Sequence, residues 1–160
     1  MTTIGSRMLA LAMISATSWA NADSGSADLV NTFATTYSRM ELPGQSITGG
    51  SIHGAGSVVK ASGVLFREGD NFVTECIVYA KKSDAGLDLE APCMHTDTAG
   101  DKLYYVARRK SGDMNAGGPG QQELVGGTGR FSGIRGSCTF KTEYVSATQA
   151  VSHQSCQWQR

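Results

Sequence analysis

Residues 124–136 read L-V-G-G-T-G-R-F-S-G-I-R-G, and no other stretch of the chain says as much about the fold. Five of these thirteen residues are glycine, with Val125, Phe131 and Ile134 between them. Glycine at this density weakens an ordinary strand or helix. The pattern therefore predicts a backbone that turns sharply or lies against another backbone, held in place by a few buried apolar side chains.

The first 22 residues have the pattern of a cleaved export signal. Arg7 supplies a positive charge, residues 8–16 form a short apolar run, and Ala20-Asn21-Ala22 is a small-x-small cleavage site. The apolar run is shorter than the roughly 20 residues needed to span a bilayer. We expect cleavage after Ala22, a single mature domain over residues 23–160, a periplasmic or secreted location, and no membrane insertion.

The charge balance argues against a polyanionic partner. Lys plus Arg and Asp plus Glu number 14 each, and loss of Arg7 with the signal leaves 13 against 14. A chain so close to neutral has no long-range field that would gather nucleic acid or anionic lipid. We therefore expect no nucleic-acid partner.

The four cysteines are Cys76, Cys93, Cys138 and Cys156, an even number that favours disulfides in an exported chain. The first two are symmetric about a turn-like segment at 83–86, and the last two are symmetric about Ala147. If both segments are hairpins, each pair lies directly across adjacent strands, within disulfide range. This predicts the bonds Cys76–Cys93 and Cys138–Cys156. The rival interpretation is a four-cysteine metal site, but the C-x-x-C spacing that zinc clusters usually have is absent, so we expect no metal.

Alternating apolar and polar residues predict strands along most of the chain. The predicted strands cover residues 58–67, 72–81, 87–96, 102–110, 137–145 and 150–158. The glycine-rich segment 112–120 is interpreted as a connecting loop. Between residues 28 and 40, the apolar residues Leu29, Phe33, Tyr37 and Met40 fit one face of a helix, although threonine is frequent there.

Antiparallel pairing sorts the side chains of the first four predicted strands into two faces. Pairing about the turn at 68–71 places Arg67 opposite Phe72 and Gly63 opposite Cys76. One face then collects Val59, Ala61, Gly63, Leu65, Val78, Ala80, Leu89, Ala91, Leu103, Tyr105 and Ala107. The other collects Lys60, Ser62, Glu75, Lys81, Asp88, Glu90, Tyr104, Arg108 and Lys110. A sheet with one apolar face and no helix to cover it closes on itself or packs against a second sheet.

The run Gly-Gly-Thr-Gly-Arg-Phe at 126–131, followed by Arg135-Gly136, resembles the G-G-T-G-[KR]-F segment of dirigent proteins and its equivalent in the allene oxide cyclases. The resemblance implies an all-β fold, a closed antiparallel meander β-barrel of about eight strands with a lipocalin-like layout, in a bacterial exported protein. It also implies an architectural role for the motif residues, which are Gly126, Gly127, Gly129, Phe131, Gly133 and Gly136.

The same resemblance bears on function. Dirigent proteins guide the coupling of phenolic radicals inside a barrel cavity without oxidising them, and the related cyclases mainly constrain the shape of their substrate. This implies a cavity for a small apolar or phenolic ligand and no cofactor. The motif is architectural in those families, so it assigns no catalytic residue here.

Other chemistry has little support in the residues. The chain has three histidines and no G-x-S-x-G elbow, which argues against a hydrolase. Asp97 and Asp101 lack the alternating acidic ligands of a calcium loop, and a hairpin turn explains them better.

The inward face carries a few polar and aromatic side chains among its apolar residues. A mostly apolar cavity with a few polar groups is the common form of a small-molecule site. The candidate ligand-binding residues are Arg67, Thr74, His95, Tyr105, Arg109, Phe140, Tyr144, Gln154 and Trp158. Taken singly, each is also explained as a satisfied core residue, or, for the two arginines, as a rim residue in water.

Three functions fit this pattern. The first is a non-enzymatic barrel that binds a small apolar or aromatic molecule. The second is a cofactor-free cyclase, isomerase or lyase in which His95 and Tyr105 transfer protons. The third, weaker one is a structural or interaction module that uses exposed Tyr79 and Tyr104. Any of the three is compatible with a homo-oligomer.

Overall fold

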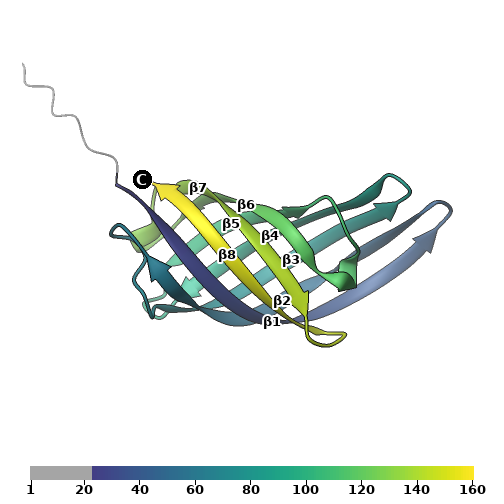
Figure 1. Cartoon of the computed structure of the whole chain (residues 1–160), viewed down its shortest axis with the longest axis horizontal. Helices are drawn as coiled ribbons and strands as arrows, with labels where there is room; N and C mark the ends of the chain where they lie inside the picture. Colours follow the sequence, from purple (N-terminus) through teal and green to yellow (C-terminus); the bar gives the residue numbers. More distant parts are fainter. Residues whose placement is uncertain (1–22) are drawn as a thin grey trace, which may run out of the picture.

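A computed structural model describes residues 23–160, which fold into an eight-stranded antiparallel barrel (Figure 1). The strands follow one another in chain order, and β1 pairs with β8 to close the barrel. Their bounds are β1 Ser24–Leu42, β2 Gln45–Ala61, β3 Asn71–Ser83, β4 Gly86–Asp97, β5 Lys102–Arg109, β6 Gly118–Gly127, β7 Arg135–Tyr144 and β8 Gln149–Gln159, with short 3-10 turns η1 Met114–Ala116 and η2 Gly129–Phe131. The predicted all-β meander barrel is confirmed. The predicted export signal, residues 1–22, lies outside the described residues.

The predicted hairpins β3–β4 and β7–β8 have the expected register. Cys76 lies opposite Cys93 and Cys138 lies opposite Cys156, and each pair forms a disulfide. Both bonds lie inside the barrel, where their cysteines are buried. Each one ties two neighbouring strands together, as the symmetry about the turns predicted.

The N-terminal segment is a strand, so the helix predicted over residues 28–40 is wrong. Leu29, Phe33 and Tyr37 recur every four residues, and that spacing keeps side chains on one face of a helix and also on one face of a strand. Met40, the odd member of the set, is mostly exposed because it points to the other side of β1. The threonines in this segment are β-branched and suit a strand.

The predicted pairing of residues 58–67 with β3 is also wrong. The strand that pairs with β3 is β2, which places Ile52 opposite Cys76. Consequently Val58 is buried and Val59 is 48% exposed, the reverse of the prediction. Gly63, with φ of +82°, lies beyond the end of β2 in the loop 62–70.

Glycines explain why the sequence pattern did not predict the whole of β2. Three inward positions of β2 are glycine, at Gly50, Gly54 and Gly56, and these glycines leave room for β1. A side chain at Gly54 would collide with the backbone of Thr32 and with Cβ of Phe33. The same misreading affected the segment 112–120, because Gly118 to Gly120 begin strand β6 rather than continuing a loop.

The two ends of the barrel are built differently. At the end we call the closed end, the loop 62–70 and the segment 128–134 bring buried side chains to the barrel, near the C-terminus and the start of β1 (Figure 1). Phe66 of that loop packs against Phe131, at 5.3 Å between ring centroids, and against Trp158, at 6.2 Å. At the opposite, open end, the β1–β2 and β3–β4 hairpins project beyond the other strands (Figure 1).

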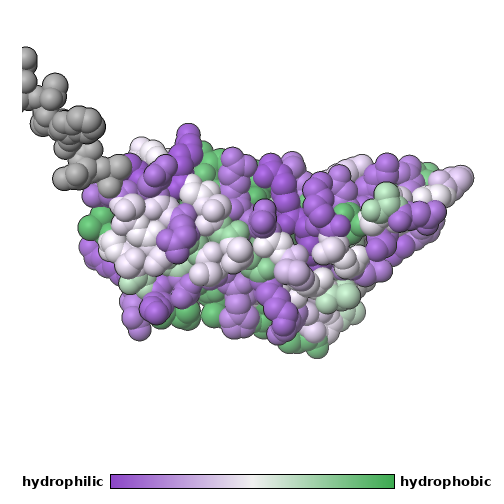
Figure 2. All heavy atoms as spheres, turned by 45° about the horizontal axis from the view of Figure 1, so that its top comes forward, coloured by the Kyte–Doolittle hydropathy of each residue, from purple (hydrophilic) through white to green (hydrophobic). Residues whose placement is uncertain are grey.

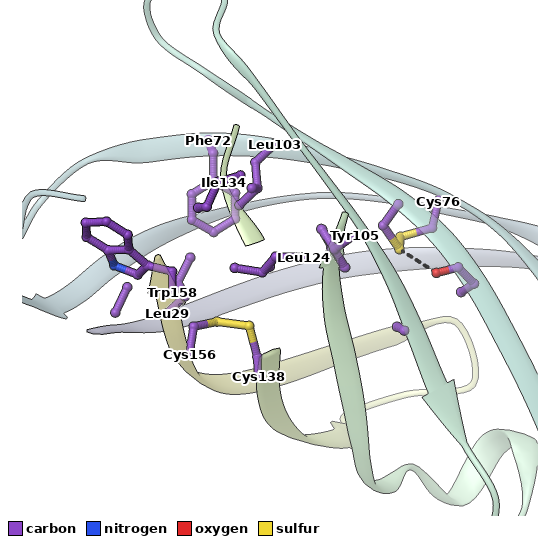
Figure 3. Packing of buried hydrophobic residues seen from close by; sticks show 14 of the residues in the cluster. Leu29, Phe72, Cys76, Leu103, Tyr105, Leu124, Ile134, Cys138, Cys156 and Trp158 are labelled. Atoms are coloured by element: carbon purple, nitrogen blue, oxygen red, sulfur yellow. Dashed lines mark hydrogen bonds between the residues drawn. A yellow bond between two sulfur atoms is a disulfide. The ribbon is translucent and has the colours of Figure 1, made fainter. Parts of the chain in front are cut away.

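Buried apolar side chains run along the inside of the barrel (Figure 3). Ile134, Phe72 and Leu103 gather near Trp158, while Cys76 and Tyr105 lie farther along the barrel. Ile134 is completely buried. The apolar core is therefore concentrated toward the closed end.

The glycine-rich segment organises the closed end around Arg130. Its Nη1 lies 2.6 Å from Asp70 Oδ2, and its Nε lies 2.8 Å from Asp97 Oδ2. The backbone N–H of Arg130 donates to Asp101 at 3.0 Å. Gly129 has φ of +51° and sits directly against the Asp101 carboxylate, so a side chain there would clash. The segment thus joins the loop 62–70 to the β4–β5 turn.

Most side chains on the outer surface are hydrophilic, with hydrophobic ones scattered among them on the face in Figure 2. Tyr79 and Tyr104 are exposed, as predicted, and Ile77 on the outer side of β3 is more exposed than either. Within residues 23–160, no helix combines the length and the apolar character needed to cross a membrane.

Candidate functional site

A cavity of about 70 Å³ lies inside the barrel. It extends from the middle of the barrel, near the Cys76–Cys93 disulfide, toward the open end. Its wall consists of Asn31, Phe33, Tyr37, Ile52, Thr74, Cys76, Val78, Leu89, Ala91, Cys93, Tyr105, Ala107, Arg109, Met114, Gln122, Phe140, Thr142, Tyr144, Ser152 and Gln154. Inward positions of all eight strands supply these residues, and η1 adds Met114.

The cavity wall includes six of the nine residues that the sequence pattern proposed for ligand binding. These six are Thr74, Tyr105, Arg109, Phe140, Tyr144 and Gln154. His95 and Trp158 are buried outside the cavity wall, toward the closed end. Arg67 is exposed in the loop 62–70, so its predicted inward position is wrong. The reason is that Arg67 follows the end of β2 and belongs to no strand.

Several wall residues were not singled out from the sequence. Asn31, Phe33 and Tyr37 were missed because β1 was interpreted as a helix. Together with Leu29, these residues are separated by two or four positions. That spacing was the signal that could have placed all of them on one face of a strand. Met114 was missed because it comes from a loop, where no periodicity fixes the direction of a side chain.

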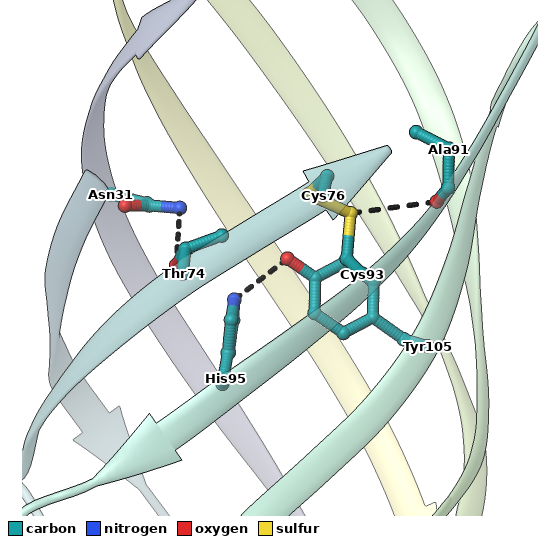
Figure 4. Close-up of a disulfide and its surroundings, with 7 residues drawn as sticks. All are labelled: Asn31, Thr74, Cys76, Ala91, Cys93, His95 and Tyr105. Carbon is teal, nitrogen blue, oxygen red and sulfur yellow. Dashed lines mark hydrogen bonds between the residues drawn. A yellow bond between two sulfur atoms is a disulfide. The ribbon is translucent and has the colours of Figure 1, made fainter. Parts of the chain in front are cut away.

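Near the middle of the barrel, Tyr105 hydrogen-bonds to His95, with 2.7 Å between the tyrosine Oη and the histidine Nε2 (Figure 4). The His95 ring also stacks on Phe72, with 4.2 Å between centroids. Burial lowers the pKa of His95 to about 3 and raises the pKa of Tyr105. Both groups are therefore neutral near pH 7, and only Tyr105 of the pair lines the cavity.

Asn31 contributes a second polar group to the same region. Its Nδ2 donates to Thr74 Oγ1 at 2.9 Å, and the contact is visible in Figure 4. Asn31 is buried, and its Oδ1 has no hydrogen-bond partner among the described residues. A buried amide oxygen without a donor costs free energy, about 1–3 kcal/mol. Asn31 is thus a polar group of the wall whose hydrogen bonding is incomplete.

The third polar group lies toward the open end. Arg109, the last residue of β5, donates through Nη2 to the carbonyl oxygens of Asp113 and Met114. The hydroxyls of Tyr37 and Tyr144 are 3.4 Å apart. Burial lowers the pKa of Arg109 and raises that of Tyr37.

Apolar side chains fill the space between these polar groups. Val78, Leu89, Ala91 and Ala107 come from three consecutive strands, and the Cys76–Cys93 disulfide lies beside them. The apolar part of the wall is therefore contributed mainly by β3–β5, and polar groups lie at the middle of the cavity and at its open end. Such a wall binds a small molecule through its hydrocarbon part and orients it through a few hydrogen bonds.

No protein-family model and no curated protein matches this chain. Among solved structures, it is similar to the pterocarpan synthase dirigent protein GePTS1, with a TM-score of 0.55, 12% sequence identity, and coverage of 96% of this chain and 99% of the other. The pterocarpan synthase dirigent protein PsPTS1 is similar with a TM-score of 0.48, 13% identity, and coverage of 84% and 94%. At 12% sequence identity, the similarity to GePTS1 is evidence for a shared fold alone. Together with the closed eight-stranded meander, it shows that this chain has the dirigent-like β-barrel fold that the segment 124–136 predicted.

Proposed function

We propose that this protein is an exported barrel that binds a small apolar or phenolic molecule in its interior cavity. The observation that carries the proposal is the buried, incompletely bonded amide of Asn31 in an otherwise mainly apolar wall. A phenolic hydroxyl both donates and accepts hydrogen bonds, so it would satisfy this amide while its ring fills the apolar space. Such a ligand would remove the cost of leaving the amide without a partner.

The size of the cavity sets the size of the ligand. As it stands, about 70 Å³ has room for a few waters, whereas a cavity of about 150 Å³ binds benzene. A one-ring ligand therefore requires a side chain to move. Met114 is the best candidate, because methionine is unbranched and adaptable. It also borders a surface depression of about 240 Å³ at the open end, which offers an entry route.

Export rests on two separate observations. Residues 1–22 have the pattern of a cleaved signal, and the two disulfides are typical of proteins that fold in an oxidising compartment. One solved structure with a similar fold is that of a pterocarpan synthase dirigent protein, which agrees with a phenolic ligand for this chain. Because fold does not determine function, the case for a ligand depends on the cavity and not on the likeness.

A binding experiment with a matched pair of variants tests the proposal. Titration of the disulfide-bonded protein with 4-propylphenol, followed by calorimetry, should give saturable binding. Ala107→Leu fills the cavity from β5 and should weaken binding at least about tenfold. Ala34→Leu makes the same change on the outer face of β1, where Ala34 is exposed, and should leave binding unchanged. Absence of binding to the wild type, or equal binding by both variants, would refute the proposal.

A second candidate, a cofactor-free cyclase, isomerase or lyase, is favoured by one observation. Tyr105 lines the cavity while its hydroxyl bonds to His95. In this version Tyr105 touches the substrate and His95 is a positioning residue that orients the hydroxyl. Tyr105→Phe should then abolish turnover of a phenolic substrate while 4-propylphenol still binds. Unchanged turnover in Tyr105→Phe would eliminate the candidate.

A further inference from the structure

We infer that the cavity selects an organic anion, and that Arg109 holds the carboxylate of that ligand. This inference rests on the ligand-binding function proposed above and specifies the chemical class of the ligand. The occupant would be a small carboxylate with an apolar, one-ring body.

The first step of the argument is the burial of an uncompensated charge. Arg109 is only 4% exposed, yet none of the ion pairs among residues 23–160 includes it. It is the only Lys, Arg, Asp or Glu in the cavity wall. Burying a cation without a counterion costs roughly several kcal/mol of folding free energy, and an anion that binds to it offsets this cost.

The second step concerns the hydrogen bonds of the guanidinium. Nη2 donates to two backbone carbonyls, those of Asp113 and Met114, and these supply partial charge only. Nε is buried and has no partner in the described part of the chain. The carboxylate of Asp113 accepts from the backbone N–H of Met114 and forms no ion pair with Arg109. The loop thus holds the guanidinium in place while leaving hydrogen-bonding capacity for a ligand.

The third step is the match between this group and its surroundings. Because Nη2 is occupied, Nε and Nη1 remain as charge-assisted donors to a carboxylate, and a guanidinium fixed by two other hydrogen bonds is already organised for binding. Tyr37 and Tyr144 line the same part of the cavity, and each hydroxyl can donate to a carboxylate oxygen. Toward the middle of the barrel, Val78 and Leu89 offer apolar surface for the rest of the ligand. This order along the cavity fits a molecule with one anionic end.

The test compares two probes of matched shape, 4-propylbenzoate and the neutral 4-propylbenzamide, with 4-propylphenol as a measure of the cavity itself. At pH 7 the wild type should bind the benzoate at least about tenfold more tightly than the benzamide, which corresponds to one charge-assisted pairing. Arg109→Met should abolish this preference and still bind 4-propylphenol. Arg108→Met is the matched control, because Arg108 is the neighbouring residue on the outer side of β5 and pairs with Glu90 and Glu123, and it should keep the preference.

Each outcome separates this inference from the proposal on which it rests. If all three probes bind the wild type with similar affinity, the selection of anions is refuted while the binding function stands. If none binds, the binding function fails first. A benzoate preference that survives in Arg109→Met would assign the anion to another group and overturn the inference. If Arg109→Met does not fold, Arg109→Gln decides, because it removes the charge and keeps an amide that can donate to the loop carbonyls. It should also abolish the preference, and an undiminished preference counts against Arg109.

Discussion

Each end of the barrel contains one largely buried arginine, and the two arginines have opposite environments. At the closed end, Arg130 lies within ion-pair distance of Asp70 and Asp97. Toward the open end, Arg109 is more deeply buried and has only backbone carbonyls as partners. The fold itself compensates the first charge, so Arg130 is explained by stability. The second charge remains uncompensated, which is the pattern expected where a ligand supplies the missing group.

The connections between the strands account for much of this difference. At the closed end, the loop 62–70 brings Leu65, Phe66 and Asp70 to the barrel, and the interior there is packed. At the open end, the hairpins project outward, and only the short turn η1 approaches the interior through Met114. Whether a small barrel is filled or hollow thus depends on which connections fold back over it.

The largest expected effect comes from exchanging the two arginines for methionine, one at a time. Arg130→Met leaves the buried carboxylate of Asp97 without an ion-pair partner, since only the backbone N–H groups of Ala99 and Asp101 still donate to it, and should lower the free energy of unfolding by about 3–5 kcal/mol. Arg109→Met removes a buried charge that forms no ion pair, and it also removes the hydrogen bonds to the carbonyls of Asp113 and Met114. Because these two effects oppose each other, stability should change by about 1 kcal/mol or less. Chemical denaturation with intact disulfides measures both. Equal losses in the two variants would mean that Arg109 has a counterion in the folded protein.

Two leucines test the difference in packing in the same way. Leu65 is almost completely buried at the closed end, whereas Leu89 is partly buried and borders the cavity. Leu65→Ala should cost about 3 kcal/mol, because the packed surroundings cannot collapse fully into the new space. Leu89→Ala should cost about half as much, since that side chain already faces open space. Similar values from urea titrations would show that the two ends are packed alike.

The free energy of unfolding should fall in acid because of His95, which lies between the two regions. Its pKa is about 3 in the folded protein, below the ordinary value of 6.5, so the unfolded chain binds a proton more readily. The contribution of His95 to stability is complete above about pH 6.5 and is lost as the pH falls, by up to about 1.4 kcal/mol per pH unit. Unfolding curves at pH 7.5, 5.5 and 4.5 measure this loss. In His95→Gln the loss should be smaller by that amount, and an unchanged pH dependence would contradict the burial of a neutral histidine.

The sequence predicts the strands whose inward positions carry recognisable apolar side chains. In β3, β4, β5, β7 and β8, alternation and the two cysteine pairs define the register. In β1 a four-residue spacing fits both a helix and a strand, and in β2 inward glycines such as Gly54 remove the alternation. The missed strands therefore share a physical cause, because their side-chain pattern does not distinguish one secondary structure from another.

The candidate site was predictable only where it lies on strands with known register. Six of its residues were proposed correctly as inward-facing, and Asn31 and Tyr37 were missed with β1. No local sequence pattern could predict that Arg130 pairs with carboxylates and that Arg109 does not. Whether a buried arginine finds a carboxylate depends on where distant loops fold, as when Asp70 reaches Arg130 across 60 positions of the chain.

The smallest expected effect comes from adding volume at two alanines. Ala27 lies in the closed half, opposite Cys156, and is almost completely buried, while Ala107 borders the cavity. Ala27→Leu should cost about 1–3 kcal/mol, because extra methylenes in a packed interior force neighbouring side chains out of their rotamers. Ala107→Leu should change stability by less than about 1 kcal/mol, since the added atoms enter space that is already open. Thermal unfolding of both variants checks this, and a large loss in Ala107→Leu would mean that the cavity is filled by neighbouring side chains in solution. That result would also weaken the case for an interior ligand, because the open space beside Ala107 is the space that such a ligand would occupy.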